Sequence, residues 1–228
     1  DSNTGSAVAR ASRAERFPAL LAARLPEGFE VLPCGRSGAT AGVGRWPYME
    51  QVVFRDALEA EAHTVIVSLG TNDVWHGDVK SYEAGMDRLL QSLKARVPTA
   101  RLLVLAPVGL KPTILSALKA EVWPAARRVA ERFAATWVFV ELGALDFKTD
   151  LVHLSPAGAV RVAEALHAEI CPEARDASLA FQAAAGAKGR LVSPKELRCR
   201  RQHPTAPLRQ PPSASPPDER MRSRSRSS

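Results

Sequence analysis

The chain has 228 residues, of which 46% are apolar, so it is long enough for one domain with a sizeable core. Its net charge of +7 is concentrated in residues 175–228, which hold twelve basic and four acidic residues, so the preceding part is nearly neutral. A globular surface built to attract nucleic acid is therefore not supported. No apolar run reaches the roughly 18 residues of a membrane span. The three cysteines are too few and too dispersed for a disulfide framework, and none forms a Cys-x-x-Cys pair.

Apolar patterning predicts strands that alternate with helices over the first 170 residues. Helical spacing, or a capping serine followed by proline, predicts helices over residues 16–25, 49–62, 80–97, 124–135 and 155–170. Short apolar runs predict buried strands over residues 29–32, 64–69, 101–106 and 137–140. This alternation predicts an α/β fold in which a parallel, doubly wound sheet forms the centre of a three-layer α/β/α sandwich.

Polar segments follow the predicted strands at their carboxyl ends. They span residues 34–40, 70–73, 107–113 and 143–153. In doubly wound sheets the functional site lies beyond the carboxyl ends of the strands. The hydrophobic pattern alone therefore predicts that these four segments surround a site.

Three residues fit nucleophilic catalysis by a serine. Asp150 precedes His153 by three residues, so its carboxylate can hold one imidazole nitrogen while the other acts as general base. Ser2 is the candidate nucleophile, because a serine hydroxyl becomes reactive when a base removes its proton. Asp146 is a rival partner for the histidine.

Four motifs occur in a fixed order along the chain: Asp-Ser-Asn-Thr at 1–4, Ser-Gly-Ala-Thr at 37–40, Leu-Gly-Thr-Asn-Asp at 69–73 and Asp-Leu-Val-His at 150–153. This ordered set resembles the SGNH (GDSL-like) hydrolases, a family of esterases and lipases, over roughly residues 1–170. Within the family the sequence is most similar to the sialate O-acetylesterase-like and short-acyl esterases. The resemblance implies a flavodoxin-like sandwich and a serine esterase that hydrolyses acyl or O-acetyl esters of small molecules through an acyl-serine intermediate.

The resemblance also implies roles for individual residues. Ser2, Asp150 and His153 are the expected catalytic residues, and the oxyanion hole is expected to combine the backbone N–H groups of Ser2 and Gly38 with the side-chain amide of Asn72. Losing one such donor typically costs roughly 10²–10³ in rate. Asp73 is expected to hold its loop rather than to react. The chemistry needs no cofactor and no metal.

Competing interpretations of single residues remain open. Ser37, within Gly-Arg-Ser-Gly-Ala, faintly resembles the nucleophile elbow of α/β-hydrolases, although Ala39 stands where that motif has its second glycine. The histidines His63 and His76 are isolated, and neither a His-Glu-x-x-His motif nor a phosphate-binding loop occurs. Three aromatic residues can line an acyl or sugar pocket or pack in the core: Tyr48, Trp75 and Trp123.

The two ends of the chain raise separate expectations. In the resembled family a buried strand that ends in glycine precedes the Asp-Ser pair, so the first strand of an SGNH-type domain over residues 1–174 is expected to be missing. Residues 175–228 form a basic Pro/Arg/Ser-rich segment that is predicted to be disordered, and residues 222–227 resemble the arginine/serine repeats of RNA-processing proteins. Two alternatives follow: a catalytically inactive, truncated relative, and a nucleic-acid-associated protein that acts through this tail. The sequence predicts no cell compartment.

Overall fold

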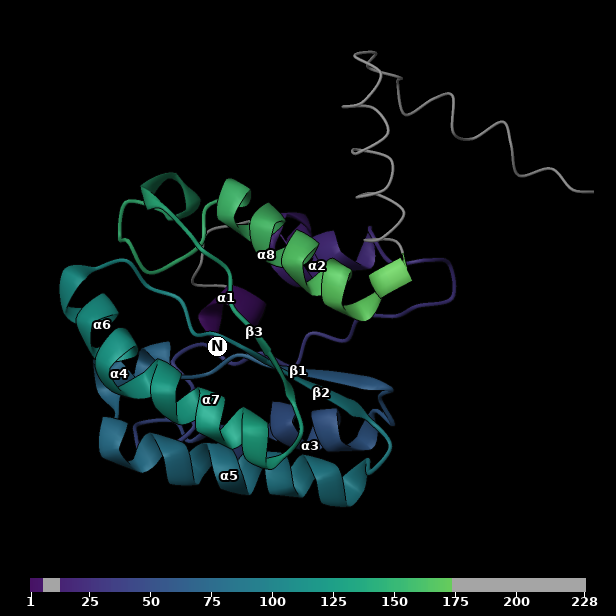
Figure 1. Cartoon of the computed structure of the whole chain (residues 1–228), viewed down its shortest axis with the longest axis horizontal. Helices are drawn as coiled ribbons and strands as arrows, with labels where there is room; N and C mark the ends of the chain where they lie inside the picture. The colour runs from purple at the N-terminus through teal and green to yellow at the C-terminus, as the bar shows by residue number, and fades with distance from the viewer. Residues whose placement is uncertain (6–12, 174–228) are drawn as a thin grey trace, which may run out of the picture. The chain divides into compact units, whose positions relative to one another are not determined.

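A sheet of three parallel strands lies at the centre of the computed structural model, which describes residues 1–5 and 13–173 (Figure 1). The strands are β1 (Thr64–Val67), β2 (Arg101–Leu105) and β3 (Thr136–Val138). β2 is the middle strand and pairs in parallel with both others. The strands predicted over 64–69, 101–106 and 137–140 are therefore confirmed: β1 and β2 end earlier than predicted, and β3 begins one residue earlier and ends two residues earlier.

Helices cover both faces of the sheet, which gives the predicted three layers (Figure 1). The first face is covered by α3 (Val52–Glu59), α5 (Val79–Arg96) and α7 (Trp123–Arg132). The opposite face is covered by α2 (Phe17–Ala22) and α8 (Pro156–Ile170). All five were predicted, although α3 begins three residues later than expected. Ser155 caps α8 as predicted, because its Oγ accepts a hydrogen bond from the Gly158 N–H at 3.2 Å.

Shorter helices form many of the connections. They are α1 (Ser2–Gly5), α4 (Thr71–His76), α6 (Pro112–Ala117), the 3₁₀ turns η2 (Arg13–Glu15), η3 (Tyr48–Glu50) and η5 (Ala144–Asp146), and the π-helical segment η4 (Leu118–Val122). None was predicted, because one or two turns are too short to establish a helical period. α4 begins within the polar segment 70–73, and η5 lies within the polar segment 143–153.

The hydrophobic core has two parts, one on each face of the sheet. Leu102 and Val104 of β2 pack with the helices of the first face, and Leu103 and Leu105 pack with α2 and α8. Successive side chains of a strand point to opposite faces, so a strand buried on both faces is continuously apolar. This explains why β2 shows no alternation of polar and apolar residues.

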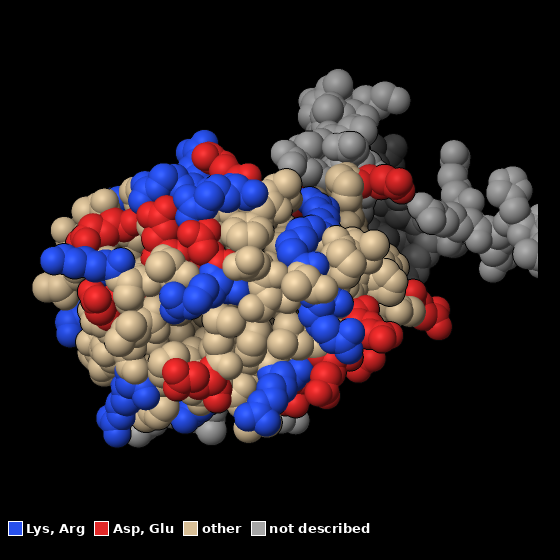
Figure 2. Space-filling model, turned by 90° about the horizontal axis from the view of Figure 1, so that it is seen from below, with Lys and Arg blue, Asp and Glu red and all other residues tan. Residues whose placement is uncertain are grey.

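The face of the molecule shown in Figure 2 carries basic and acidic side chains interspersed. Ion pairs join the two outer helices α5 and α7: Arg132 contacts Glu83 at 3.0 Å and Asp87 at 2.7 Å. These side chains are partly exposed, so each pair contributes little to stability. The mixture agrees with the nearly neutral composition of the residues before 175.

The strand predicted over residues 29–32 is wrong. Phe29 and Leu32 are each 56% exposed, and the segment pairs with no described strand. β1 also differs from its prediction, because Thr64–Ile66 are only half-buried rather than covered on both faces. Both differences from the prediction lie at the edge of the sheet that β1 forms.

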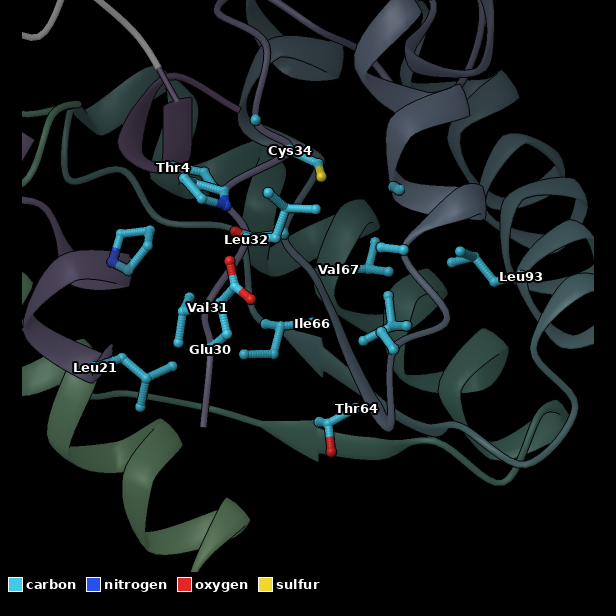
Figure 3. Close-up of a pocket in the computed structure, with 18 of the residues that line it drawn as sticks. Thr4, Leu21, Glu30, Val31, Leu32, Cys34, Thr64, Ile66, Val67 and Leu93 are labelled. Carbon is cyan, nitrogen blue, oxygen red and sulfur yellow. The ribbon is translucent and has the colours of Figure 1, made fainter. Parts of the chain in front are cut away.

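A cavity of about 830 Å³ explains both departures. It lies between residues 28–35 and β1, whose side chains line it, and we call it the edge slot (Figure 3). The edge slot is bounded by side chains from both core layers: Phe17 and Leu21 of α2, Phe54 of α3, and Leu89 and Leu93 of α5. Since it runs between the two helix layers, it continues the plane of the sheet beyond β1. Among the described residues, 29–32 therefore have no adjacent strand with which to form a ladder.

The amino group of Asp1 lies at one end of the edge slot. It donates a hydrogen bond of 3.4 Å to the carbonyl oxygen of Ser68, which follows β1. Burial lowers the pKa of this amino group from 8.0 to about 5, although the charge of Asp73 opposes the shift.

We expect a short apolar strand joined to Asp1 by a peptide bond to fill the edge slot. Running parallel to β1, it would end at the Asp1 nitrogen, and its side chains would meet both helix layers. The extension Val-Ile-Val-Leu-Gly should raise the melting temperature by at least the roughly 2–4 °C that ~1 kcal/mol gives a domain of this size. A Gly-Ser extension of equal length serves as the control. Equal melting temperatures for the two extensions would contradict the expectation.

Candidate active site

Three predicted residues from opposite ends of the described chain form one hydrogen-bonded series. Ser2 Oγ lies 3.1 Å from His153 Nε2, although 151 positions separate the two residues. His153 Nδ1 lies 2.8 Å from Asp150 Oδ2. When the proton of the imidazole is on Nδ1, it is donated to the Asp150 carboxylate. Nε2 then has no proton and can accept the hydrogen bond of the Ser2 hydroxyl. The arrangement can therefore remove the proton from Ser2.

The loop that carries Asp150 and His153 is held in a strained conformation. Leu151 has φ of +57°, a left-handed conformation that is uncommon for a bulky residue. This turn brings the N–H groups of Val152 and His153 to Asp150 Oδ1, each at 2.9 Å. The Leu151 carbonyl accepts N–H groups from residues 110–111 at 2.7 and 3.1 Å. These bonds hold both catalytic candidates in place.

The hydrogen bonds to Asp150 also keep it ionised. Partial burial acts to raise the pKa of this carboxyl, but the N–H groups of His153 and Val152 and the His153 imidazole outweigh it, so the pKa is lowered overall. The carboxylate is about half exposed, whereas the His153 side chain is mostly covered. Asp150 can therefore fix the histidine tautomer and stabilise its protonated form.

Asn3 joins the first turn of the chain to the catalytic loop. Its Oδ1 accepts the buried N–H of Leu154 at 2.9 Å, and its own N–H donates to Asp1 Oδ1 at 3.0 Å. The bond from Leu154 fixes the chain next to Ser2 against the chain next to His153. Sequence reasoning missed this role, and the only signal was an amide side chain beside the predicted nucleophile.

Two predicted oxyanion donors are backbone N–H groups without a partner. Among the described residues, the N–H groups of Ser2 and Gly38 donate to no acceptor. Gly38 has φ of +74°, and a Cβ there would lie 2.6 Å from the Trp46 ring, so only glycine fits. Backbone N–H groups that have no acceptor of their own are what a developing oxyanion requires.

Asn72, the third predicted donor, follows β1 in α4. Its Nδ2 donates to the Ala39 carbonyl at 3.1 Å, which joins α4 to the loop that contains Gly38. A primary amide has two N–H groups, so one remains for a ligand. Gly70 starts α4 with φ of +134°, where a Cβ would come within 2.8 Å of Pro107 and Val122.

Asp73 was expected to hold its own loop, and its carboxylate instead binds the neighbouring segment of residues 41–42. Its buried carboxylate accepts the N–H of Ala41 at 3.0 Å and that of Gly42 at 2.8 Å. Burial raises the pKa of this carboxyl, and the hydrogen bonds from the two N–H groups oppose the shift. Its contacts are therefore with backbone groups of the loop rather than with Ser2 or His153.

The rival residues lie elsewhere. Asp146 Oδ2 accepts the Gly143 N–H at 2.8 Å and pairs with Arg161 Nη1 at 2.7 Å, so it does not orient the histidine. The hydrogen bonds of the His153 ring go to Ser2 and Asp150, and none of those described goes to Ser37.

The three aromatic candidates differ in exposure. The Tyr48 hydroxyl donates to the Cys34 carbonyl at 2.8 Å, and Trp123 Nε1 donates to the Pro107 carbonyl at 2.9 Å. Both side chains pack against the core, whereas Trp75 is 45% exposed. The edge slot includes neither Ser2 nor His153 in its lining, so it is a separate feature from the candidate active site.

Two further findings concern residues 1–5 and 13–173. No cluster of three or more His, Cys, Asp or Glu side chains suited to a metal ion occurs there. No helix in the same residues has the length and apolar character needed to cross a membrane. The predicted tail over 175–228 lies outside the described residues.

Solved structures with similar folds include two esterases. A carbohydrate acetylesterase from Sinorhizobium meliloti is 20% identical, and the similarity covers 75% of this chain and 95% of that chain with a TM-score of 0.58. The aryl esterase of M. smegmatis is 18% identical over 71% of this chain and 86% of that chain, with a TM-score of 0.54. A comparison with curated protein sequences finds no match. At these identities the structural similarity establishes the α/β fold.

The sequence itself establishes the family. The model of the GDSL-like lipase/acylhydrolase family matches residues 1–161, a span that includes all the residues predicted for the site. The resemblance drawn from the four motifs is therefore confirmed. The chain belongs to the GDSL-like lipase/acylhydrolase family and is a carboxylic ester hydrolase.

Proposed function

We propose that the chain hydrolyses esters through an acyl-Ser2 intermediate, with His153 as general base and Asp150 as the residue that orients it. The observation that carries this proposal is the series Ser2 Oγ, His153 and Asp150, with separations of 3.1 and 2.8 Å. As Ser2 Oγ attacks the carbonyl carbon, His153 Nε2 takes its proton. The imidazolium then gives this proton to the departing alcohol.

The tetrahedral intermediate needs donors for its negative oxygen. The unpaired N–H groups of Ser2 and Gly38 supply two, and the second amide N–H of Asn72 supplies a third. In the second half of the reaction, His153 takes a proton from water, whose oxygen attacks the acyl carbon. Collapse of that intermediate returns the proton to Ser2 Oγ and releases the carboxylic acid. Every step is performed by side chains and backbone groups of this chain.

We assign the substrate to short-acyl or O-acetyl esters of small molecules. The four motifs resemble the short-acyl branch of the family, and two structural neighbours are named as a carbohydrate acetylesterase and an aryl esterase. The edge slot does not border Ser2, so it offers no tunnel for a long acyl chain at the nucleophile. Acetyl esters are therefore the first substrates to assay.

The two alternatives carry less support. A catalytically inactive relative would be expected to have lost contacts among the catalytic residues, yet Ser2, His153 and Asp150 lie within hydrogen-bond distance. A nucleic-acid-associated function would depend on residues 175–228, which the structure does not describe. Neither alternative explains why the N–H groups of Ser2 and Gly38 have no acceptor among the described residues.

Replacing Asp150→Asn tests the role of the carboxylate. Asn Oδ1 can keep the N–H bonds of Val152 and His153, but Nδ2 would face His153 Nδ1 and favour the wrong tautomer. We expect kcat for 4-nitrophenyl acetate to fall about 10³–10⁴-fold with the melting temperature nearly unchanged. Asp78→Asn is the matched control, because Asp78 also accepts a backbone N–H, from Lys80 at 3.0 Å, outside the site. Near wild-type turnover in Asp150→Asn would rule out this role.

Replacing Asn72→Ala tests the oxyanion hole. The donor is needed most when negative charge develops, so kcat should fall by roughly 10²–10³ while KM changes little. Gln51→Ala is the control, because Gln51 Nε2 donates a similar amide-to-carbonyl bond of 2.9 Å to Pro47 away from Ser2. A loss confined to KM, or a loss equal to that of Gln51→Ala, would assign Asn72 a purely structural role.

A further inference from the structure

The ammonium group of Lys111 lies over the exposed ring of Trp75. Lys111 Nζ lies 4.5 Å from the centroid of the Trp75 ring, and both side chains are exposed. Among the described residues, no carboxylate lies within ion-pair distance of Lys111. Arg161, the cation next to the catalytic loop, is instead compensated by Asp146. The Trp75–Lys111 pair is thus an apolar surface with an uncompensated positive charge.

Both residues are attached to parts of the site. Trp75 follows Asn72 by three residues in α4, and residues three apart share a helix face. The backbone N–H of Lys111 donates to the Leu151 carbonyl at 3.1 Å, which fixes Lys111 to the loop between Asp150 and His153. The pair therefore spans from the helix of the oxyanion donor to the loop of the general base.

The chemistry indicates which part of an ester this pair would meet. The alcohol oxygen must receive its proton from His153 Nε2, so the alcohol departs on the histidine side of the carbonyl carbon. The backbone N–H of Lys111 is bonded to the loop that carries His153. The acyl group occupies the other side. Of the two parts of the ester, the alcohol is therefore the one on the side of the loop to which Lys111 is bonded.

We propose that Trp75 and Lys111 form the binding subsite for the alcohol part of the ester, and that this alcohol bears a carboxylate next to a flat or apolar group. The proposal rests on the proposed ester hydrolysis at Ser2. The indole packs against the flat group, and the Lys111 ammonium donates a charge-assisted hydrogen bond to the carboxylate. An acidic alcohol supplies the negative charge that the described protein does not place beside Lys111.

Two aryl acetates that differ in charge test the proposal: 4-acetoxybenzoate and its neutral methyl ester. Both give up the same acetyl group to Ser2, and the leaving alcohol either carries a carboxylate or does not. The measured quantity is the ratio of kcat/KM for the charged ester to kcat/KM for the neutral one. Lys111→Gln should lower this ratio about threefold to fivefold, as expected for a partly exposed ion pair. Lys111→Arg should keep it, and 0.5 M salt should reduce the difference between variants.

The controls separate this subsite from the catalytic chemistry. Lys119→Gln removes an exposed charge in η4 and should leave the ratio at the wild-type value. Trp75→Leu should lower kcat/KM for both aryl esters through KM rather than kcat. A ratio that Lys111→Gln leaves unchanged, with both esters still hydrolysed, would overturn the charged subsite alone. If the wild-type chain hydrolyses neither ester, the proposed function fails and this inference fails with it.

Discussion

The contact between the first turn of the chain and residues 150–154 is the constraint on which the candidate active site depends. Ser2 can react only if its hydroxyl stays within hydrogen-bond distance of His153, and the two residues belong to segments at opposite ends of the described chain. The buried bond from the Leu154 N–H to Asn3 Oδ1 holds those segments together. A displacement of about 1 Å can cost ~10²-fold in rate, so this buried bond supports catalysis as well as the fold.

The remaining loops are positioned by conformations that the sequence only partly reveals. Gly38 and Gly70 adopt positive φ where neighbouring side chains exclude a Cβ, and Leu151 adopts positive φ despite its bulk. Such strain persists only where surrounding bonds hold it, here the N–H groups of residues 110–111 on the Leu151 carbonyl and those of Val152 and His153 on Asp150. The sheet supports these loops, and the backbone conformation of the loops sets the direction of the reacting groups.

Much of the fold could be predicted because it depends on local periodicity. β2 buries a continuous apolar run, and α5 buries apolar residues that recur at helical spacing. The bounds of both elements were predicted to within about one residue. Residues 29–32 have the same composition as a buried strand, yet a strand also needs a neighbour, and the edge slot lies where that neighbour would be. The ordered motifs placed Ser2, His153 and Asp150 in the site, whereas Asn3 was missed because its partner, Leu154, is remote in the sequence.

The acyl-Ser2 intermediate can be trapped and located on the chain. The full chain is mixed with excess 4-nitrophenyl acetate, quenched in acid within the first turnovers, digested and analysed by mass spectrometry. We expect an acetyl group on the peptide that contains Ser2. It should accumulate further if Asn72→Ala slows deacylation more than acylation, and it should be absent in Ser2→Ala. Turnover with the acetyl group on another residue, such as Ser37, or turnover that persists in Ser2→Ala, would contradict this expectation.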